Sequence, residues 1–247
     1  MNYFERDLAL LRYLHKFKVA TYEQIHRDIY PEYKLNTVRI RVLKMMKDKF
    51  IKGFQDKLFR KGQKVVSLTK LGFEKFLQNG EERRMELKSE AIDHDLELID
   101  VHYHLMQSPK FISYFSENQL QTWGSPDEDD VNNLIKLNND AIAKISFNKG
   151  EIYCAIEYEH SQKSKLKYTT ILKKIYNCDD LPLILYVCKD KSIMDKISGL
   201  EKEIYADPNP KIFYQLLHEI ISGDTFKFYN HHNKYLEFIK HKPPLRP

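Results

Sequence analysis

Residues 21–49 have the sequence TYEQIHRDIYPEYKLNTVRIRVLKMMKDK, and this stretch decides the fold of the amino-terminal third of the chain. The hydroxyl of Thr21 precedes a short helical pattern, and Gln24 stands where it can complete a capping box. Pro31 cannot continue a helix, so the pattern should end at about Tyr30. The first half of the stretch therefore predicts a short helix that is followed by a turn.

A second helix begins near Asn36 or Thr37. Its apolar residues recur three and four positions apart, which is the spacing of one buried helix face: Val38, Val42, Met45 and Met46. Its basic residues point elsewhere: Arg39, Arg41, Lys44 and Lys47. Two helices joined by a tight turn, the second of them rich in cations, are typical of a helix-turn-helix.

The flanking segments extend this pattern on both sides. Residues 4–17 form an amphipathic helix before it, with leucines at helical spacing. After it, the short apolar runs 51–54 and 65–68 enclose a basic, glycine-containing loop and predict a β-hairpin, and another helix starts at Thr69. The order helix, helix, helix, hairpin is that of a winged helix-turn-helix, which we assign to residues 1–80.

This assignment predicts a set of residues that contact double-stranded DNA. The third helix would enter the major groove, where its first residues can reach base edges and phosphates. The candidates on and before this helix are Lys34, Asn36, Thr37, Arg39, Arg41 and Lys44. The candidates on the wing are Lys57, Arg60, Lys61 and Lys64. A winged helix used only for protein contacts is the alternative, and the density of Lys and Arg on these two elements favours DNA.

Charge is distributed unevenly along the chain. Residues 1–80 contain 18 Lys and Arg against 8 Asp and Glu, a balance of +10, and residues 81–247 contain 22 against 27, a balance of −5, which together give the net +5. A basic module joined to a mildly acidic domain fits a nucleic-acid-binding protein. The glutamate-rich segment 81–90 marks the change, and we place the domain boundary near residues 78–86.

Composition excludes several other classes of protein. The chain has 247 residues, 42% of them hydrophobic, and only 8 Gly and 9 Pro, which favours packed domains over a disordered or fibrous chain. No apolar run is long enough to span a membrane, and the first residues are charged too early for a secretion signal. Three cysteines cannot form a disulfide framework. These features predict a cytoplasmic protein with no membrane partner.

Residues 86–247 predict a second domain of mixed α/β structure. A long helix to about residue 107 precedes a strand at 111–119, a hairpin of strands at 141–147 and 151–159, and a helix at 164–176. The continuous apolar run at 181–188 indicates a buried central strand, and a helix near 193–204 and a strand at 211–217 follow. Helical or irregular segments complete the chain. The order α-β-β-β-α-β is the core of the restriction-endonuclease-like fold, also called PD-(D/E)xK.

The chemistry of that fold requires carboxylates that hold Mg²⁺ or Mn²⁺ at one end of the sheet. Asp140 begins the second strand, and Glu157 and Glu159 lie on one face of the third because they are two positions apart. These three acids are our candidate metal ligands and catalytic residues. Glu90, which shares a helix face with His94, is a further candidate.

One departure from the usual motif stands against catalysis. Glu159 occupies the position where a lysine is expected, and Lys163 or Lys165 could supply the missing cation from just downstream. The alternatives are that Asp140 is only a strand-entry residue and that the acidic site is a vestige. Whether the domain is an enzyme is left open at this stage, with a non-catalytic role favoured.

With these residues in view, the chain resembles the replication-relaxation family of bacterial plasmids and other mobile elements. The segments that support the resemblance are VVSLTKLGFEKF, IDHDLELIDVHYHL, NNDAIAKI and CAIEYEHSQKSKLKY, within roughly residues 5–190. The family combines an amino-terminal winged helix with a PD-(D/E)xK nuclease-like domain. The resemblance implies a DNA-binding regulator or accessory factor in plasmid replication, mobilisation or transcription.

Three functions remain as hypotheses. The leading one is a DNA-binding protein of a plasmid or mobile element whose nuclease-like domain is degenerate. The second is a Mg²⁺-dependent endonuclease or nickase that the winged helix targets to its site. The third is an assembly factor that recruits replication, mobilisation or transposition proteins. A homodimer would fit the first, because two half-sites multiply affinity.

Overall fold

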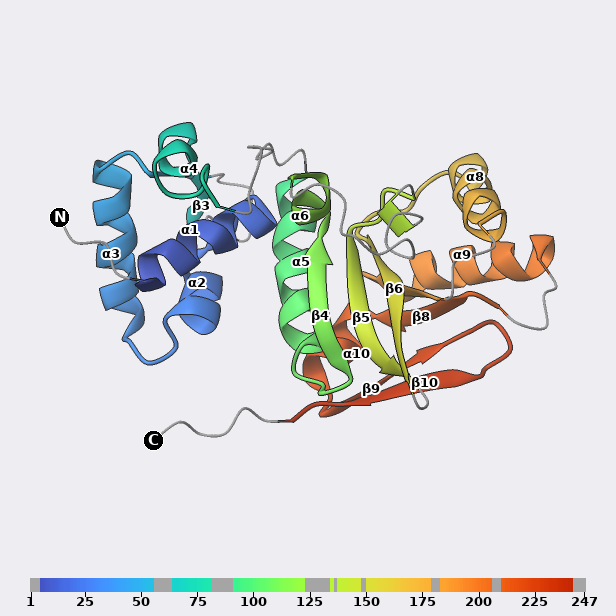
Figure 1. Ribbon diagram of the computed structural model, residues 1–247. Coiled ribbons are helices and arrows are strands. Elements are labelled where there is room, and N and C mark those ends of the chain that lie inside the picture. The colour runs from blue at the N-terminus through green and yellow to red at the C-terminus, as the bar shows by residue number, and fades with distance from the viewer. Residues whose placement is uncertain are drawn as a thin grey trace. The chain divides into compact units, whose positions relative to one another are not determined.

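The structure is a computed structural model that describes residues 5–55, 64–80, 91–122, 134–135, 137–147, 150–178, 183–205 and 210–241. Within these ranges the chain has mixed α+β structure (Figure 1). It divides into two units, residues 1–99 with 118–124 and residues 100–117 with 125–247. The first unit thus extends beyond the predicted range of 1–80, and the helix Ile92–Leu105 (α5) spans the division of the chain.

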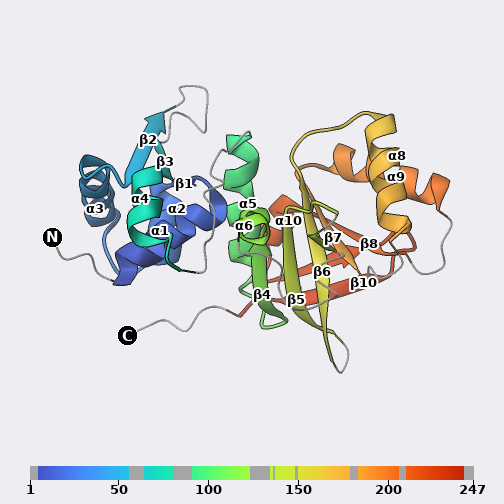
Figure 2. The same ribbon diagram turned by 45° about the horizontal axis from the view of Figure 1, so that its top comes forward.

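The first unit contains four helices and a small sheet among its residues up to Phe76. The order is α1 (Glu5–Phe17), β1 (Ala20–Thr21), α2 (Tyr22–Ile29), α3 (Leu35–Lys47), β2 (Ile51–Gln55), β3 (Lys64–Leu68) and α4 (Lys70–Phe76). The strands form an antiparallel sheet in the order β1-β3-β2, and β2 and β3 run side by side (Figure 2). This is the predicted order of elements, although the winged-helix assignment itself stays a prediction.

Local hydrogen bonds explain where these helices begin. The backbone N–H of Gln24 donates to the hydroxyl of Thr21 at 3.2 Å, and the backbone N–H of Thr21 donates to the Gln24 amide at 3.1 Å. This confirms the capping box. Thr69 caps α4 in the same way, through Gly72 at 3.1 Å. Only glycine fits at position 72, because a Cβ atom there would lie 2.4 Å from the carbonyl oxygen of Phe50.

The second unit is built on a seven-stranded sheet. Its strands are β4 (Phe111–Ser116), β5 (Ala141–Phe147), β6 (Gly150–Glu159), β7 (Ile184–Cys188), β8 (Ile212–Leu216), β9 (Thr225–Tyr229) and β10 (Tyr235–Ile239). They lie in the order β10-β9-β8-β7-β6-β5-β4, with β6, β7 and β8 parallel. The helices α8 (Lys165–Tyr176) and α9 (Lys191–Ile204) connect these parallel strands and pack against each other, and α10 (Leu217–Ser222) follows β8 (Figure 1).

The sheet curls until its two ends approach each other. The rings of Phe111 at the start of β4 and Phe238 in β10 lie 4.9 Å apart, centre to centre. The backbone N–H of His241 donates to the carbonyl oxygen of Gln107 at 2.9 Å. The buried run of β7 lies at the middle of this sheet, as its continuous apolar sequence predicts.

Two predicted features of this unit are wrong. The strand expected at 111–119 ends at Ser116, and the polar residues that follow form a short helix, α6 (Glu117–Thr122), whose first N–H donates to the carbonyl oxygen of Asp140 at 2.8 Å. The last residues, expected to be helical or irregular, form the β9–β10 hairpin instead. There the side chains of Phe226, Phe228 and Phe238 bury themselves against the sheet core.

Candidate nucleic-acid interface

Helix α3 has one face in the core of the first unit and the opposite face in water. Val38, Val42 and Met45 are buried, as their spacing predicts. The residues on the other side are exposed, and most of the predicted DNA contacts are among them: Lys34, Asn36, Thr37, Arg39 and Lys44. Lys47 is exposed as well. The helix therefore presents a polar and cationic surface while its apolar stripe holds it in place.

The two predicted arginines are held by carboxylates of the same unit. Arg39 forms an ion pair with Glu23 of α2 at 3.0 Å, and both side chains are exposed. Arg41 binds Asp7 of α1 with two nitrogens, and its Nε lies 2.7 Å from Oδ1 of that carboxylate. The side chain of Asp7 is only 2% exposed, so this second pair is part of the packed interior.

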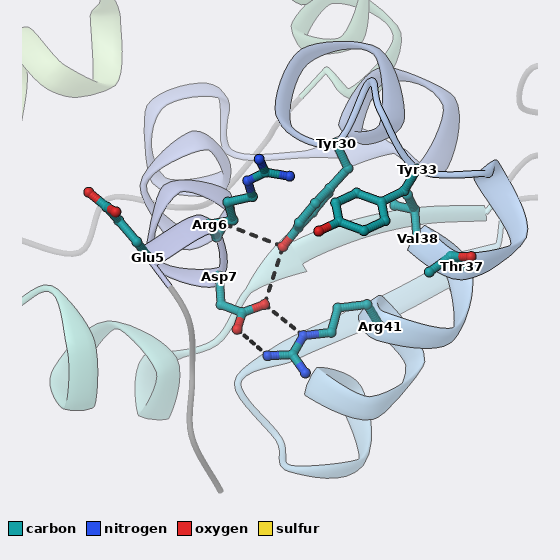
Figure 3. Close-up of a pocket in the computed structure, with 8 residues that line it drawn as sticks. All are labelled: Glu5, Arg6, Asp7, Tyr30, Tyr33, Thr37, Val38 and Arg41. Carbon is teal, nitrogen blue, oxygen red and sulfur yellow. Dashed lines mark hydrogen bonds and ion pairs between the residues drawn. The ribbon is translucent and has the colours of Figure 1, made fainter. Parts of the chain in front are cut away.

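The Asp7–Arg41 pair forms one wall of a cavity of about 510 Å³ (Figure 3). The hydroxyl of Tyr30 donates to Asp7 at 3.2 Å from the side opposite Arg41. Burial, together with the negative charge of Asp7, raises the pKa of Tyr30, so this phenol remains a donor. Tyr33 and Thr37 complete the wall nearest the start of α3. These contacts fix α3 against α1 and α2.

Unlike the two arginines, the lysines on and before α3 have no carboxylate partner among the described residues. Lys34 precedes α3, makes no capping hydrogen bond with its side chain and is exposed. Lys44 and Lys47 lie one turn apart on the exposed side, and no carboxylate of the described residues pairs with either of them. A lysine without an internal partner can neutralise an external anion at no cost to the fold. The positive charges on and before α3 that have no ion-pair partner among the described residues therefore belong to lysines.

Three of the four predicted wing contacts, Lys57, Arg60 and Lys61, lie outside the described residues. The fourth, Lys64, is the first residue of β3 and is exposed, in contrast to the four buried residues that follow it in the strand. Of the four predicted wing contacts, Lys64 is therefore the one that the structure describes, at the edge of the hairpin.

The predicted acidic residues Asp140, Glu157 and Glu159 lie on neighbouring strands, where β5 begins and β6 ends. The two strands are antiparallel, so Asp140, just before β5, lies beside the end of β6. Its carboxylate accepts a hydrogen bond from the backbone N–H of Tyr158 at 2.7 Å. Glu157 and Glu159 pair in register with Tyr186 and Cys188 of β7, which confirms that the two glutamates share a face.

Glu159 is neutralised inside the fold. Its carboxylate, 3% exposed, lies 2.5 Å from the ammonium of Lys163 and accepts a hydrogen bond from the hydroxyl of Tyr186 at 3.1 Å. Burial and then the carboxylates of Glu157 and Glu159 raise the pKa of Tyr186 well above its usual value, so its hydroxyl stays protonated. Lys163 thus supplies the cation beside Glu159.

The remaining catalytic candidates do not join this cluster. Lys165 pairs with Glu203 of α9 at 3.1 Å, and both side chains are exposed. Glu90 lies outside the described residues. Among the residues that are described, no three His, Cys, Asp or Glu side chains form a group that could hold a metal ion. Mg²⁺ and Mn²⁺ need several oxygen ligands, so the binding of either ion stays a prediction.

Sequence reasoning missed a second buried carboxylate in the same unit. Glu201 of α9 is fully buried and accepts hydrogen bonds from the hydroxyls of Tyr176 and Tyr214, the latter at 3.0 Å. The ring Nδ1 of His231, in the β9–β10 turn, lies 3.0 Å from the same carboxylate. No local pattern links these residues, because they come from four separate elements. The cluster ties the terminal hairpin to α9.

Comparison with known proteins adds no assignment: no family model, no curated protein and no solved structure matches the chain. Over the ranges that the structure describes, every helix is too short or too polar to cross a bilayer.

Proposed function

We propose that this protein binds double-stranded DNA through the outer face of α3. The observation that supports this most directly is the set of exposed lysines on and before that helix, Lys34, Lys44 and Lys47, which have no ion-pair partner among the described residues. The resemblance to the replication-relaxation family supplies the biological context. In that context the protein acts as a regulator or accessory factor in the replication, mobilisation or transcription of a plasmid or mobile element.

The geometry of α3 suits this role in a winged helix-turn-helix. A 13-residue helix is about 20 Å long, and the major groove of B-DNA, about 12 Å wide, admits a helix. The buried stripe of Val38, Val42 and Met45 leaves the whole opposite face for the groove. Exposed Lys64, at the start of β3, would reach a flanking phosphate.

The second unit then serves as a nuclease-like scaffold without catalysis. Glu159 replaces the expected lysine and is neutralised by Lys163 and Tyr186. The carboxylate of Asp140 accepts a hydrogen bond from the backbone of β6. Such a unit would contact either a second stretch of DNA or the replication, mobilisation and transposition proteins that the family context implies.

Binding to duplex DNA tests this proposal. The affinity of purified protein for a fluorescent duplex of mixed sequence is measured by anisotropy at low salt for wild type and for Lys44→Ala/Lys47→Ala. The proposal expects a loss of roughly ten-fold per lysine, because each neutralises a phosphate. The matched control is Lys191→Ala/Lys202→Ala, which removes two exposed lysines from α9 and should leave affinity unchanged. Equal affinity in all three proteins would refute the proposal.

A Mg²⁺-dependent endonuclease is the second candidate, and one observation favours it. The ammonium of Lys163 lies beside the acidic residues, where a nuclease of this class needs a cation. Catalysis would require Glu159 to exchange that partner for a metal ion. Titration with Mg²⁺ and Mn²⁺ in a calorimeter decides the matter: binding by wild type that disappears in Asp140→Ala would favour the endonuclease, and no binding would remove it.

A further inference from the structure

Four residues of α3 form a straight stripe down the middle of its exposed face. Asn36, Ile40, Leu43 and Lys47 are spaced four, three and four positions apart, which keeps them on one side of a helix. The buried residues Val38, Val42 and Met45 occupy the opposite side. Any surface that α3 meets is therefore met first by this stripe.

The two central residues of the stripe are apolar, and water surrounds them. The side chain of Ile40 is 61% exposed and that of Leu43 is 48% exposed. They stand among polar residues, with Asn36 on one side and Lys44 and Lys47 on the other. Apolar side chains in the centre of a cationic face gain free energy only when a partner covers them.

The surrounding charge argues that this partner is a nucleic acid. Lys34, Lys44 and Lys47 flank the two aliphatic side chains and have no acidic partner among the described residues. A second protein would need to supply carboxylates to this surface, whereas duplex DNA presents phosphates along both edges of its groove. The floor of the major groove also offers apolar surface, in the form of the 5-methyl groups of thymine.

The same stripe contains no arginine, and its one lysine, Lys47, is among those that we assign to phosphates. Bidentate contacts from arginine or lysine are the commonest specific contacts to guanine, and both arginines of α3 are paired with carboxylates, Arg39 with Glu23 and Arg41 with Asp7. The exposed amide of Asn36 instead matches the donor and acceptor of an adenine edge. The chemistry of the stripe therefore matches A·T base pairs.

We infer that α3 selects a run of A·T pairs, with Ile40 and Leu43 packing on thymine methyl groups and Asn36 contacting adenine. This inference rests on the proposed function and adds the class of DNA site to it. The spacing is suitable, because Ile40 and Leu43 are separated by about 4.5 Å along the helix axis and adjacent bases of one strand by about 3.4 Å. Neighbouring base pairs thus receive neighbouring side chains.

The first experiment finds the site. Wild-type protein selects duplexes from a random library through repeated rounds of binding at about physiological salt. The inference expects the enriched sequences to share a core of consecutive A·T pairs. An enriched core of G·C pairs would overturn it while leaving DNA binding intact. Failure to bind any duplex would instead refute the proposed function.

The second experiment removes the methyl groups alone. Each thymine of the selected core is replaced in turn by deoxyuridine, which lacks the 5-methyl group and keeps the hydrogen-bonding edge. For wild type, affinity should fall about four-fold at each of two positions, the effect of uncovering one methyl group. Ile40→Ala should be insensitive at one of these positions and Leu43→Ala at the other. Unchanged wild-type affinity for every deoxyuridine duplex would overturn the inference.

Two controls complete the test. Leu71→Ala shortens an exposed leucine on α4 and should behave as wild type with every duplex. Sedimentation equilibrium of Ile40→Ala/Leu43→Ala examines the competing explanation, that a second copy of the chain covers the stripe. A wild-type dimer that dissociates in this variant, together with insensitivity of wild type to deoxyuridine, would assign the stripe to an interface between copies and overturn the inference.

Discussion

The outer face of α3 and the end of β6 both gather charged residues, but they use them in opposite ways. On α3 the lysines at 34, 44 and 47 are exposed and have no partner among the described residues. At the end of β6 the carboxylate of Glu159 is buried and is held by Lys163 and Tyr186. A charged side chain without an internal partner is available to a ligand, whereas a paired one is already neutralised within the protein.

The same contrast exists within α3 itself. Arg41 is paired within the protein, because it neutralises the buried Asp7, whereas its neighbour Lys44 is available to a ligand. A count of basic residues in the sequence treats the two alike.

Arg41→Met should destabilise the protein by about 3 kcal/mol, because it leaves the buried charge of Asp7 without compensation. Hydrogen exchange should show faster exchange of the amides of α1, α2 and α3, with β6 and β7 unaffected. Adding Asp7→Asn to the variant should recover much of the loss. A loss of unfolding free energy under about 0.5 kcal/mol would mean that the fold does not need the Asp7–Arg41 pair and that Arg41 is available to a ligand.

Lys163→Met should cost about 2 kcal/mol and should act on the other unit. The variant leaves Glu159 buried, with the hydroxyl of Tyr186 as the one donor that remains among the described residues. Faster exchange is expected in β6 and β7, and the second substitution Glu159→Gln should restore stability. Lys165→Met serves as the control, since its exposed pair with Glu203 contributes little. If both lysine variants behave alike, the acidic residues are not neutralised as described.

Lys16 offers a pH-dependent test of buried charge. Burial lowers its pKa to about 8, from 10.5 in the unfolded chain. Between these values the unfolded chain binds a proton that the folded protein does not, so stability should rise with pH. We expect a gain of about 2 kcal/mol between pH 7.5 and 9.5 in urea unfolding. Lys16→Met should remove this pH dependence; a variant that keeps it would assign the effect to another group.

Arg39→Ala should have the smallest effect. Its pair with Glu23 is exposed on both sides, and such pairs contribute about 0.5 kcal/mol or less. Thermal unfolding should therefore change by no more than a degree or two. A loss as large as that of Arg41→Met would mean that exposure does not distinguish the two arginines.

The features that local sequence determines were predictable. The Thr21 capping box and the β5–β6 hairpin depend on residues close together in the chain, and both are present as expected. The β9–β10 hairpin was missed although its signal exists, since apolar residues alternate at Phe226 and Phe228 and again at Leu236 and Phe238.

Contacts between distant segments could not be predicted. Asp7 and Arg41 are 34 residues apart, and nothing near either residue indicates that they pair. Glu159 and Lys163 are only four positions apart, yet the sequence suggested Lys163 and Lys165 only as cations for the acidic site and not as partners of Glu159. The third member of this group, Tyr186, comes from another strand and was missed. The availability of a charge depends on such contacts, and only the structure shows them.

The salt dependence of DNA binding shows whether the lysines of α3 are the charges that meet DNA. The logarithm of the association constant is measured against the logarithm of the KCl concentration for wild type, Lys44→Ala/Lys47→Ala and Lys191→Ala/Lys202→Ala. If the lysines of α3 are the available charges, the slope should become shallower by about 1.8 in the first variant, since each phosphate contact contributes about 0.9. The slope of the α9 variant should match that of wild type. Identical slopes for all three proteins would contradict the account.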